Sequence, residues 1–442
     1  MLLLGNGLLI TRDAENRIIP DGCVAVADDL IVEVGITSEL KKKYPEAGFM
    51  DAGNKLIMPG LINTHMHFYS TFARGMFLDG DPPVNFGEIL EKLWWRLDKT
   101  LTLEDVYYSA LVPVIDSIKN GTTTVFDHHA SPNSARGSLF KIAEATKKAG
   151  LRACLCYEVS DRDGAVIAAD GIQENIDFLN HCYCEKDPML KGMFGLHASL
   201  TLSDQTLDKC VALNSSTGTG FHIHAAEGPE DLNDAKARYG MGVIERLQAR
   251  RILGPKSIAA HCIHISPEEI GILKNSGTNV VHNPESNMGN AVGVSPVLKM
   301  MAQGITVGLG TDGYTSDMFE SLKVANCLHK HASHHPSIAW EEPPRMLFAN
   351  NRRIAEEYFE KPLGSLAAGA YADIIVVDYN PPTRLDPGNV NSHLLFGVSG
   401  RAVDTSIING RTIMEKRKLL FLDEAEISAK SRELAEKVWK RI

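Results

Sequence analysis

Four side chains of metal-ligand type stand at the ends of apolar, strand-like runs of this 442-residue sequence: His65, His67, His224 and Asp312. His65 and His67 are two residues apart, so on an extended strand their side chains point to the same side. A catalytic divalent metal takes about three protein ligands of imidazole or carboxylate type and keeps one position open for water. We therefore expect the four residues to bind one metal ion, with a His-x-His in an exposed loop as the alternative for the first pair.

The segment 221–227 around the third histidine offers two further candidates. His222 shares a strand face with His224, so either imidazole can be the ligand, and His224 is favoured. Glu227 follows the strand end, where a carboxyl group can move protons during catalysis, and a structural ion pair is the alternative for it.

Two later strand ends complete the set of catalytic candidates. His261 ends the run 257–261 and is expected either to bind the metal or to hold its water and the substrate. Glycines at 310 and 313 flank Asp312 and let the backbone approach closely while the carboxylate faces the ion. A Gly-Thr-Asp-Gly turn with only structural meaning is the alternative. We expect Glu227, His261 and Asp312 to be the catalytic residues.

Repeated strand and helix units must bring these distant residues together. Eight short apolar or β-branched runs alternate with longer amphipathic segments, as in the βα units of a parallel sheet. The runs are 56–64, 122–127, 151–157, 191–197, 220–224, 257–261, 278–282 and 305–310. In a (β/α)₈ barrel the active site lies at the carboxyl ends of the strands, so one pole collects residues from the whole chain. We therefore predict an α/β fold with a (β/α)₈ barrel of the TIM type over residues 56–363.

Both ends of the chain differ from this middle part. Short strands separated by turn residues are expected at 8–11, 23–27, 31–34, 372–378, 403–408 and 411–415. A charged amphipathic helix is expected at 424–442. We predict that residues 1–55 and 364–442 together build a small β-sandwich domain that carries this helix.

The segments between the runs show helical spacing. Helices over 103–118 and 138–149 should end at Gly121 and Gly150. The segment 69–100 is long and rich in aromatic residues, so it is either a lid over the site or a packed helix. Helix packing is the favoured interpretation of Trp94 and Trp95.

Composition narrows the class of protein. With 45 Lys and Arg against 55 Asp and Glu, the formal charge of −10 argues against nucleic-acid and anionic-membrane partners and suits a small uncharged or cationic substrate. The eight cysteines include no Cys-x-x-Cys pair and are expected to be reduced thiols. No apolar stretch approaches the roughly 18 residues of a membrane helix, and the start has no basic leader. A cytoplasmic protein is expected.

Several motifs, taken together, are highly specific for one family. They are Pro59-Gly-Leu-Ile-Asn-Thr-His65-Met-His67, His224-x-x-Glu227, Ala260-His261-Cys262, His282-Asn-Pro-Glu-Ser-Asn287, Thr311-Asp312-Gly313 and Gly369-Ala-Tyr-Ala-Asp373. In these motifs the chain resembles the amidohydrolase superfamily, in its branch of mononuclear deaminases and chlorohydrolases. The resemblance implies one zinc ion, with iron as the alternative, on the four ligands above, and it implies that Glu227 and His261 act on substrate. No lysine stands near the end of the run 191–197, where two-metal relatives carry a bridging carbamate.

The resemblance also concerns the substrate. His197 matches a position that contacts substrate in the family, and we place His128, His129 and His282 in the same pocket, although structural histidines would look the same. Deaminases of adenosine derivatives carry arginines after strand three to hold the ribose, whereas this chain has Glu158 and a single arginine there. A free purine- or pterin-like base is therefore favoured over a nucleoside.

These observations lead to one expected function with alternatives. We expect a metal-dependent aminohydrolase that attacks an amidine-like C–N unit of a nitrogen heterocycle with metal-activated hydroxide and releases ammonia. Hydrolytic opening of a cyclic amide, or displacement of a ring halide, would use the same metal site. An inactive metal-binding scaffold is a remote alternative, because the catalytic residues are all present. The resemblance also allows a homodimer.

Overall fold

Nine short strands in the middle of the chain form two parallel sheets. The computed structural model describes residues 1–78 and 80–442. One sheet has the order β6-β7-β8-β9, with bounds Leu61–Met66, Thr122–His129, Arg152–Tyr157 and Leu190–Gly192. The other has the order β10-β11-β12-β13-β14, with bounds Phe194–Ala198, Phe221–Ala225, Ile258–His261, Asn279–His282 and Val307–Leu309. All neighbours in both sheets are parallel, which confirms the α/β class.

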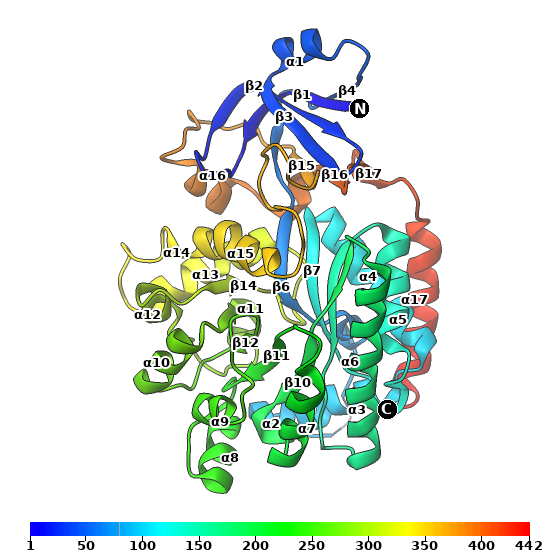
Figure 1. Cartoon of the computed structure of the whole chain (residues 1–442), viewed down its shortest axis with the longest axis vertical. Coiled ribbons are helices and arrows are strands. Elements are labelled where there is room, and N and C mark those ends of the chain that lie inside the picture. Colours follow the sequence, from blue (N-terminus) through cyan, green and yellow to red (C-terminus); the bar gives the residue numbers. More distant parts are fainter. Residues whose placement is uncertain (79) are drawn as a thin grey trace.

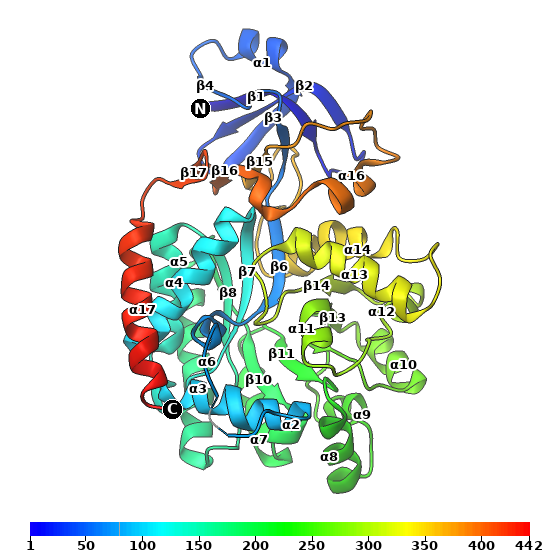
Figure 2. The same cartoon turned by 180° about the vertical axis from the view of Figure 1, so that it is seen from behind.

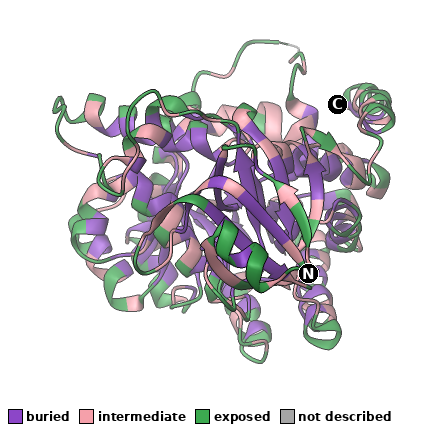
Figure 3. Ribbon diagram, turned by 90° about the horizontal axis from the view of Figure 1, so that it is seen from above, coloured by how far each residue is buried: buried purple, intermediate pink, exposed green. Residues whose placement is uncertain are grey.

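Two single bridges connect residues of the two sheets or directly beside them. Met66 of β6 pairs in parallel with Asp312, and Val159 pairs in parallel with Leu196 of β10. Every residue of β6 and β7 is buried, as expected for parallel strands covered on both faces. Figure 3 shows the buried residues gathered in the central strands and the exposed residues on the outer helices.

Two of the predicted strands are each divided between two sheets. The run 56–64 forms β5 (Leu56–Pro59) in a third sheet and β6 in the first, with Gly60 between them. A Cβ atom on Gly60 would lie 2.2 Å from Thr123 Cγ2, so the close approach of β7 requires glycine. The run 191–197 divides at Met193, whose N–H donates to the carbonyl of Leu155, while the N–H of Phe194 donates to the carbonyl of Gly220. Apolar runs do not reveal such a change of hydrogen-bond partner.

Helices lie around the outside of the parallel strands (Figures 1 and 2). The α-helices are α1 (Thr37–Lys43), α2 (Phe86–Ile89), α3 (Trp95–Thr100), α4 (Leu103–Lys119), α5 (Ser138–Ala149), α6 (Ala165–Glu185), α7 (Asp204–Asn214), α8 (Pro229–Tyr239), α9 (Val243–Ala249), α10 (Pro267–Ser276), α11 (Pro284–Gly289), α12 (Val297–Ala302), α13 (Met318–Ala332), α14 (Glu342–Pro344), α15 (Asn351–Glu356), α16 (Val390–Gly397) and α17 (Glu424–Trp439). The shorter 3₁₀ or π turns are η1 (Phe68–Ala73), η2 (Leu90–Trp94), η3 (Pro132–Ser134), η4 (Ser199–Thr201), η5 (Arg345–Asn350) and η6 (Gly400–Ala402). None of the helices in residues 1–78 and 80–442 combines the length and the apolar character needed to cross a membrane.

Local sequence explains where α4 and α5 begin and end. Thr102 and Asp105 form a capping box at the start of α4, in which each side chain accepts from the other's backbone N–H. Gly121, with φ +84°, follows the end of α4, and Gly150, with φ +76°, ends α5 in the left-handed conformation. Both predicted helices and their glycine stops are confirmed.

Both ends of the chain contribute strands to one nine-stranded sheet. Its path is β18-β17-β16-β15-β5-β1-β2-β3, with β4 on β1. The bounds are β1 (Leu2–Ile10), β2 (Ile18–Ala27), β3 (Leu30–Ile36), β4 (Gly48–Asp51), β15 (Ile374–Val377), β16 (Val403–Ile408), β17 (Arg411–Glu415) and β18 (Lys418–Leu419). This terminal sheet lies at one end of the molecule (Figures 1 and 2). The described strands form a single sheet, and a sandwich of two facing sheets stays a prediction.

The C-terminal helix α17 packs along α4, as Figure 1 shows. The indole Nε1 of Trp439 donates to the carbonyl of Phe72 over 2.7 Å. At the other end of α17, Lys119 Nζ lies 2.6 Å from Glu424 Oε1. The predicted amphipathic helix is therefore present and is fixed at both ends to the middle part of the chain.

Candidate active site

The predicted metal ligands lie at the carboxyl ends of their strands. His65 is in β6 and His67 directly follows it, His224 is in β11, and Asp312 comes shortly after β14. The backbone N–H groups of Thr311 and Asp312 both donate to the carbonyl oxygen of His65 over 3.0 Å. This backbone contact sets the carboxylate beside the two histidines of β6.

The ligand atoms of these four residues form one compact cluster. One ligand atom from each of His65, His67, His224 and Asp312 lies within 4.8 Å of the others. Asp312 Oδ1 lies 3.0 Å from His67 Nε2 and 3.7 Å from His65 Nε2, and the Nε2 atoms of His67 and His224 are 3.1 Å apart. His65 Nε2 is buried and has no hydrogen-bond partner among the described residues. Three imidazoles and a carboxylate that converge around an unsatisfied nitrogen fit one divalent cation.

The opposite ring nitrogens of the three histidines face protein groups. His67 Nδ1 faces the carbonyl oxygen of His128, and His224 Nδ1 lies 2.9 Å from that of His197. His65 Nδ1 lies 2.8 Å from His222 Nε2. Such outer contacts fix the tautomer and the orientation of a metal-binding imidazole. The structure thus places His224, and not His222, in the cluster, while His222 contacts the ring nitrogen of His65 that faces away from the cluster.

Burial keeps two of the imidazoles neutral, which is the form that binds metals. Burial lowers the pKa of His65 to about 3 and the pKa of His224 well below its usual range. His67 differs: burial lowers its pKa, but the carboxylate of Asp312 outweighs burial and raises the pKa of His67 to about 9. The carboxylate of Asp312 therefore favours positive charge on this side of the cluster.

Four of the described residues at this pole have a left-handed backbone. The φ angles are +50° at Ala226, +72° at His261, +48° at Cys262 and +53° at Asp312. Non-glycine residues in such conformations cost on the order of 1–3 kcal/mol and tend to cluster at functional sites. Two of the four are predicted catalytic residues, and Ala226 lies between the ligand His224 and Glu227.

Glu227 and His261 stand beside Asp312 on one side of the cluster. His261 Nε2 lies 3.5 Å from Glu227 Oε2 and 3.6 Å from Asp312 Oδ2. His261 Nδ1 lies 2.8 Å from the side-chain oxygen of Asn287, so it carries the proton and leaves Nε2 toward the site. Glu227 Oε1 accepts from the side-chain amide of Asn290 over 3.4 Å. Burial raises the pKa of Glu227 to about 7, so this carboxyl group can hold a proton near neutral pH.

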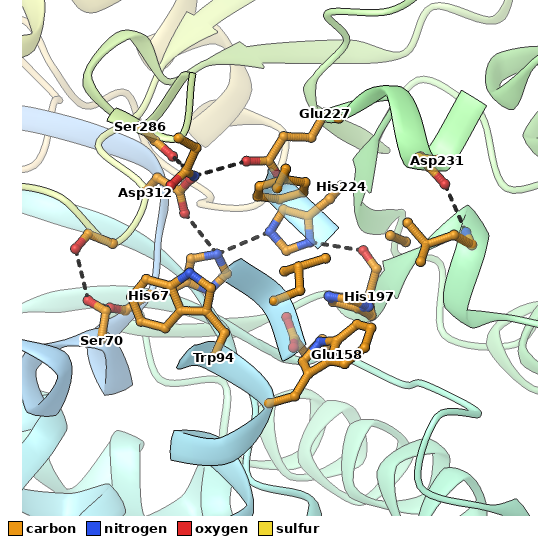
Figure 4. Close-up of a pocket in the computed structure, with 18 of the residues that line it drawn as sticks. His67, Ser70, Trp94, Glu158, His197, His224, Glu227, Asp231, Ser286 and Asp312 are labelled. Atoms are coloured by element: carbon orange, nitrogen blue, oxygen red, sulfur yellow. Dashed lines mark hydrogen bonds and ion pairs between the residues drawn. The ribbon is translucent and has the colours of Figure 1, made fainter. Parts of the chain in front are cut away.

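A cavity opens in front of the cluster, and Figure 4 shows how its side chains converge. Its empty volume is about 720 Å³, including space that is open to solvent. His67, His224, Glu227 and Asp312 line it, and the aromatic residues Tyr69, Phe86, Trp94 and Trp95 add flat apolar surface. Trp94 and Trp95 therefore belong to the wall of the cavity, where the sequence favoured ordinary helix packing, because η2 and α3 lie across this part of the site.

The four histidines predicted to contact substrate occupy different positions. His197 lines the cavity, and burial lowers its pKa to about 4, so the imidazole is neutral. In the described part of the chain, the other three lie behind the wall and bond to protein groups. His129 Nε2 lies 2.9 Å from Ser131 Oγ, His128 Nε2 lies 3.1 Å from the carbonyl of His222, and His282 Nε2 lies 3.1 Å from His329 Nε2. Their strand-end positions were predicted, but each has a partner within the core.

Two further acidic residues line the cavity without having been predicted there. Glu158 directly follows β8, so its strand-end position was the signal for it. Asp231 lies in the first turn of α8, and no feature of the sequence distinguishes it from other acids at helix starts. Both are buried in spite of their charge.

Comparisons with known proteins agree with this geometry. The model of the Amidohydrolase family matches residues 56–413. The 5'-deoxyadenosine deaminase of Methanosarcina mazei is 32% identical over 445 residues, covering 100% of this chain and 99% of that protein. The 5-methylthioadenosine/S-adenosylhomocysteine deaminase of Pelotomaculum thermopropionicum is 32% identical over 439 residues, covering 98% of each.

A solved structure shares the fold over nearly the whole length. The adenosine deaminase of Xanthomonas campestris with bound zinc superposes with a TM-score of 0.87 at 22% identity, covering 99% of this chain and 98% of that one. Family match, relatives and site agree that this chain is a hydrolase of carbon–nitrogen bonds, and it belongs to the amidohydrolase family.

Proposed function

We propose that this chain is a metal-dependent aminohydrolase that removes an amino group from a purine- or pterin-like heterocycle and releases ammonia. The observation that carries the proposal is the position of Glu227, a buried carboxyl group with a raised pKa, which lies between the amide of Asn290 and the imidazole of His261 at the edge of the metal cluster. A deaminase needs such an acid, because the ring nitrogen and the leaving amine must both gain a proton.

The residues of the cluster divide the chemistry among them. When bound there, a divalent metal lowers the pKa of a water molecule toward about 7 and so supplies hydroxide near neutral pH. Asp312 accepts the proton of the attacking water on Oδ2, because Oδ1 faces the ligand His67 at 3.0 Å while Oδ2 lies on the side of His261, at 3.6 Å from its Nε2. Glu227 gives its proton to the ring nitrogen. In its doubly protonated form, with Nδ1–H bound to Asn287 and Nε2–H donating into the site, His261 stabilises the charge that develops on the oxygen. The amine then takes the proton held by Asp312 and the C–N bond breaks, while the hydroxyl proton of the adduct returns to Glu227. The products are ammonia and a cyclic amide.

Zinc is the metal we propose, with iron as the alternative. Three imidazoles and one carboxylate suit either ion, and the superposed adenosine deaminase contains zinc. The test is metal removal with a chelator, followed by reconstitution with zinc or with ferrous iron. Activity must disappear in the metal-free protein and return with one metal, and activity that persists without metal would refute the proposal.

The choice of compounds to test as substrates follows from both the sequence and the relatives. The sequence favours a free base over a nucleoside, whereas the relatives are named for 5'-deoxyadenosine, 5-methylthioadenosine and S-adenosylhomocysteine. The panel therefore contains purine and pterin bases, adenosine derivatives and triazines. Released ammonia supports deamination, whereas a ring-opened acid or a halide ion would identify ring opening or dehalogenation at the same site.

The architecture that we propose for this enzyme is a closed (β/α)₈ barrel over 56–363, with a small β domain of sandwich type from 1–55 and 364–442. The parallel bridges Met66–Asp312 and Val159–Leu196 support closure, because one links β6 to the residues that follow β14 and the other links the residues that follow β8 to β10. The nine-stranded terminal sheet, which takes strands from both chain ends, supports the second unit.

A further inference from the structure

Glu158 is a carboxylate in the cavity wall that the proposed reaction does not use. It follows β8, lines the cavity and is only 5% exposed. In Figure 4 it lies on the opposite side of His224 from Glu227. A buried carboxylate is costly unless it has partners, so its position beside the substrate space calls for a role.

One oxygen of Glu158 is engaged and the other is open. Oε2 lies 3.0 Å from His128 Nδ1, and the other nitrogen of that ring, Nε2, lies 3.1 Å from the carbonyl oxygen of His222. The contact with His128 engages Oε2, and Oε1 has no hydrogen-bond partner within residues 1–78 and 80–442. Oε1 can therefore accept a hydrogen bond from a ligand, because a carboxylate oxygen is an acceptor.

The described remainder of the wall offers this oxygen no lysine or arginine as a partner. Among the described residues, no Lys or Arg side chain lines the cavity. The nearby Arg162 does not line the cavity: it pairs with Asp98, lies 3.0 Å from Asp163 and packs over the ring of Trp95, while its Nη1 has no hydrogen-bond partner among the described residues. The wall therefore offers acceptors and flat aromatic surface but no cationic partner for a phosphate or carboxylate group.

Glu158 is close enough to the ligands to reach the heterocycle itself. One ligand-type atom each of His67, His128, Glu158 and His224 lies within 4.8 Å of the others. A purine or pterin ring that presents its reacting carbon to the cluster is therefore within reach of the Glu158 carboxylate.

Given the proposed deaminase activity, we propose that Glu158 selects the substrate by accepting a hydrogen bond from an N–H or amino group of the heterocycle's own ring system. It follows that the substrate class is a flat, uncharged or protonated base with at least one such donor besides the amino group that is removed. A charged acceptor that loses its donor is left unsatisfied, so analogues without the donor are rejected.

The test is a binding measurement by calorimetry on the zinc-loaded protein in the Glu227→Gln background, so that turnover does not accompany binding. The probes are 2,6-diaminopurine, adenine, 9-methyladenine and adenosine, which add or mask single donors. The protein that carries only Glu227→Gln is the parent. We expect it to bind 2,6-diaminopurine more tightly than adenine, or adenine more tightly than 9-methyladenine, by roughly 10- to 100-fold. Glu158→Met should abolish that preference, and Glu158→Gln, which keeps an acceptor oxygen, should retain part of it.

The controls separate recognition from a merely structural role. Glu91→Met removes the same charge from an exposed position on η2 and should bind all probes as the parent does. Equal loss of every probe in Glu158→Met, or no preference in the parent, would overturn the proposal. A preference that appears only for adenosine over 9-methyladenine would place the donor on the sugar and also overturn it. Donor-dependent binding without ammonia release by the unmodified protein would refute the deaminase activity alone.

Discussion

Asp231 Oδ2 accepts a hydrogen bond from the backbone N–H of Ala226 over 2.8 Å. Its second oxygen, Oδ1, accepts from the N–H of Leu200 over the same distance of 2.8 Å. One carboxylate on α8 thus fixes the left-handed residue that precedes Glu227 and the loop that follows β10. Asp231 is in this way a positioning residue for the acid at position 227.

We expect Asp231→Asn to lower kcat more than it raises KM. The amide keeps one acceptor but turns a donor toward the second N–H, which leaves a buried group unsatisfied and shifts Glu227. A displacement of a catalytic group by about 1 Å can lower the rate roughly 100-fold. Steady-state ammonia release measures the effect. Asp234→Asn, on the same helix but paired only with Arg238 at the surface, is the matched control and should behave as the unmodified protein.

His222 and His224 should differ sharply in metal binding. His224→Ala removes a ligand and should abolish stoichiometric zinc, whereas His222→Ala removes only the support of His65 Nδ1 and should weaken zinc about 10- to 100-fold. Metal content after dialysis against graded chelator measures both. If His222→Ala lost zinc as completely as His224→Ala, the ligand set would have to be revised.

Glu227→Gln should retain the metal and lose turnover. The amide keeps the size of the side chain but cannot donate an acidic proton, so kcat should fall by roughly 10²- to 10⁴-fold. Metal analysis and ammonia release on the same sample check the two halves of this expectation. A variant that lost its zinc together with its activity would point to a ligand role for Glu227.

Glu285 should make stability depend on pH. Burial raises the pKa of this carboxyl group to about 7 from its usual 4.5, so the folded chain binds a proton that the unfolded chain releases. Stability from this group is complete below about pH 4.5 and is lost as the pH rises toward 7. Glu285→Gln should therefore raise the Tm at pH 8 and leave it nearly unchanged at pH 4.5. Equal shifts at the two pH values would contradict the raised pKa.

The ion pair of Arg152 and Asp373 should be important for stability, because both side chains are almost fully buried. Asp373 Oδ1 also accepts from the N–H of Asn409 over 2.8 Å, which ties β8 to the terminal sheet. Asp373→Asn leaves the guanidinium uncompensated and should cost about 3–5 kcal/mol in the free energy of unfolding. Glu144→Gln, in a surface pair with Lys141, should cost less than about 1 kcal/mol by the same denaturant titration.

The ligand cluster could be predicted from the sequence because strand ends of a parallel sheet converge at one edge. His65, His67, His224 and Asp312 each follow an apolar run, and their convergence depends on the order of strands and not on side-chain packing. His129 and His282 also follow such runs, yet both have partners in the core. The position of a residue in the sequence predicts that it lies at the carboxyl end of a strand. It does not predict whether the side chain points into the cavity or into the core behind the cavity wall.

Other features depend on tertiary contacts that leave little trace in the sequence. Asp231 acquires its role only when two loops from different strands reach its oxygens. Trp94 and Trp95 have the spacing of an ordinary helix, and only the course of α3 across the site makes them part of the cavity. The division at Gly60 was equally hidden, since 56–64 is one continuous apolar run.

That division has a mechanical consequence. A single glycine separates the strand that is clamped between β1 and β15 from the strand that ends in His65 and His67. A shift of the terminal sheet would therefore reach two of the four predicted metal ligands through one residue. We expect truncation or fusion at either terminus to change the metal affinity, although both termini are remote from the cluster.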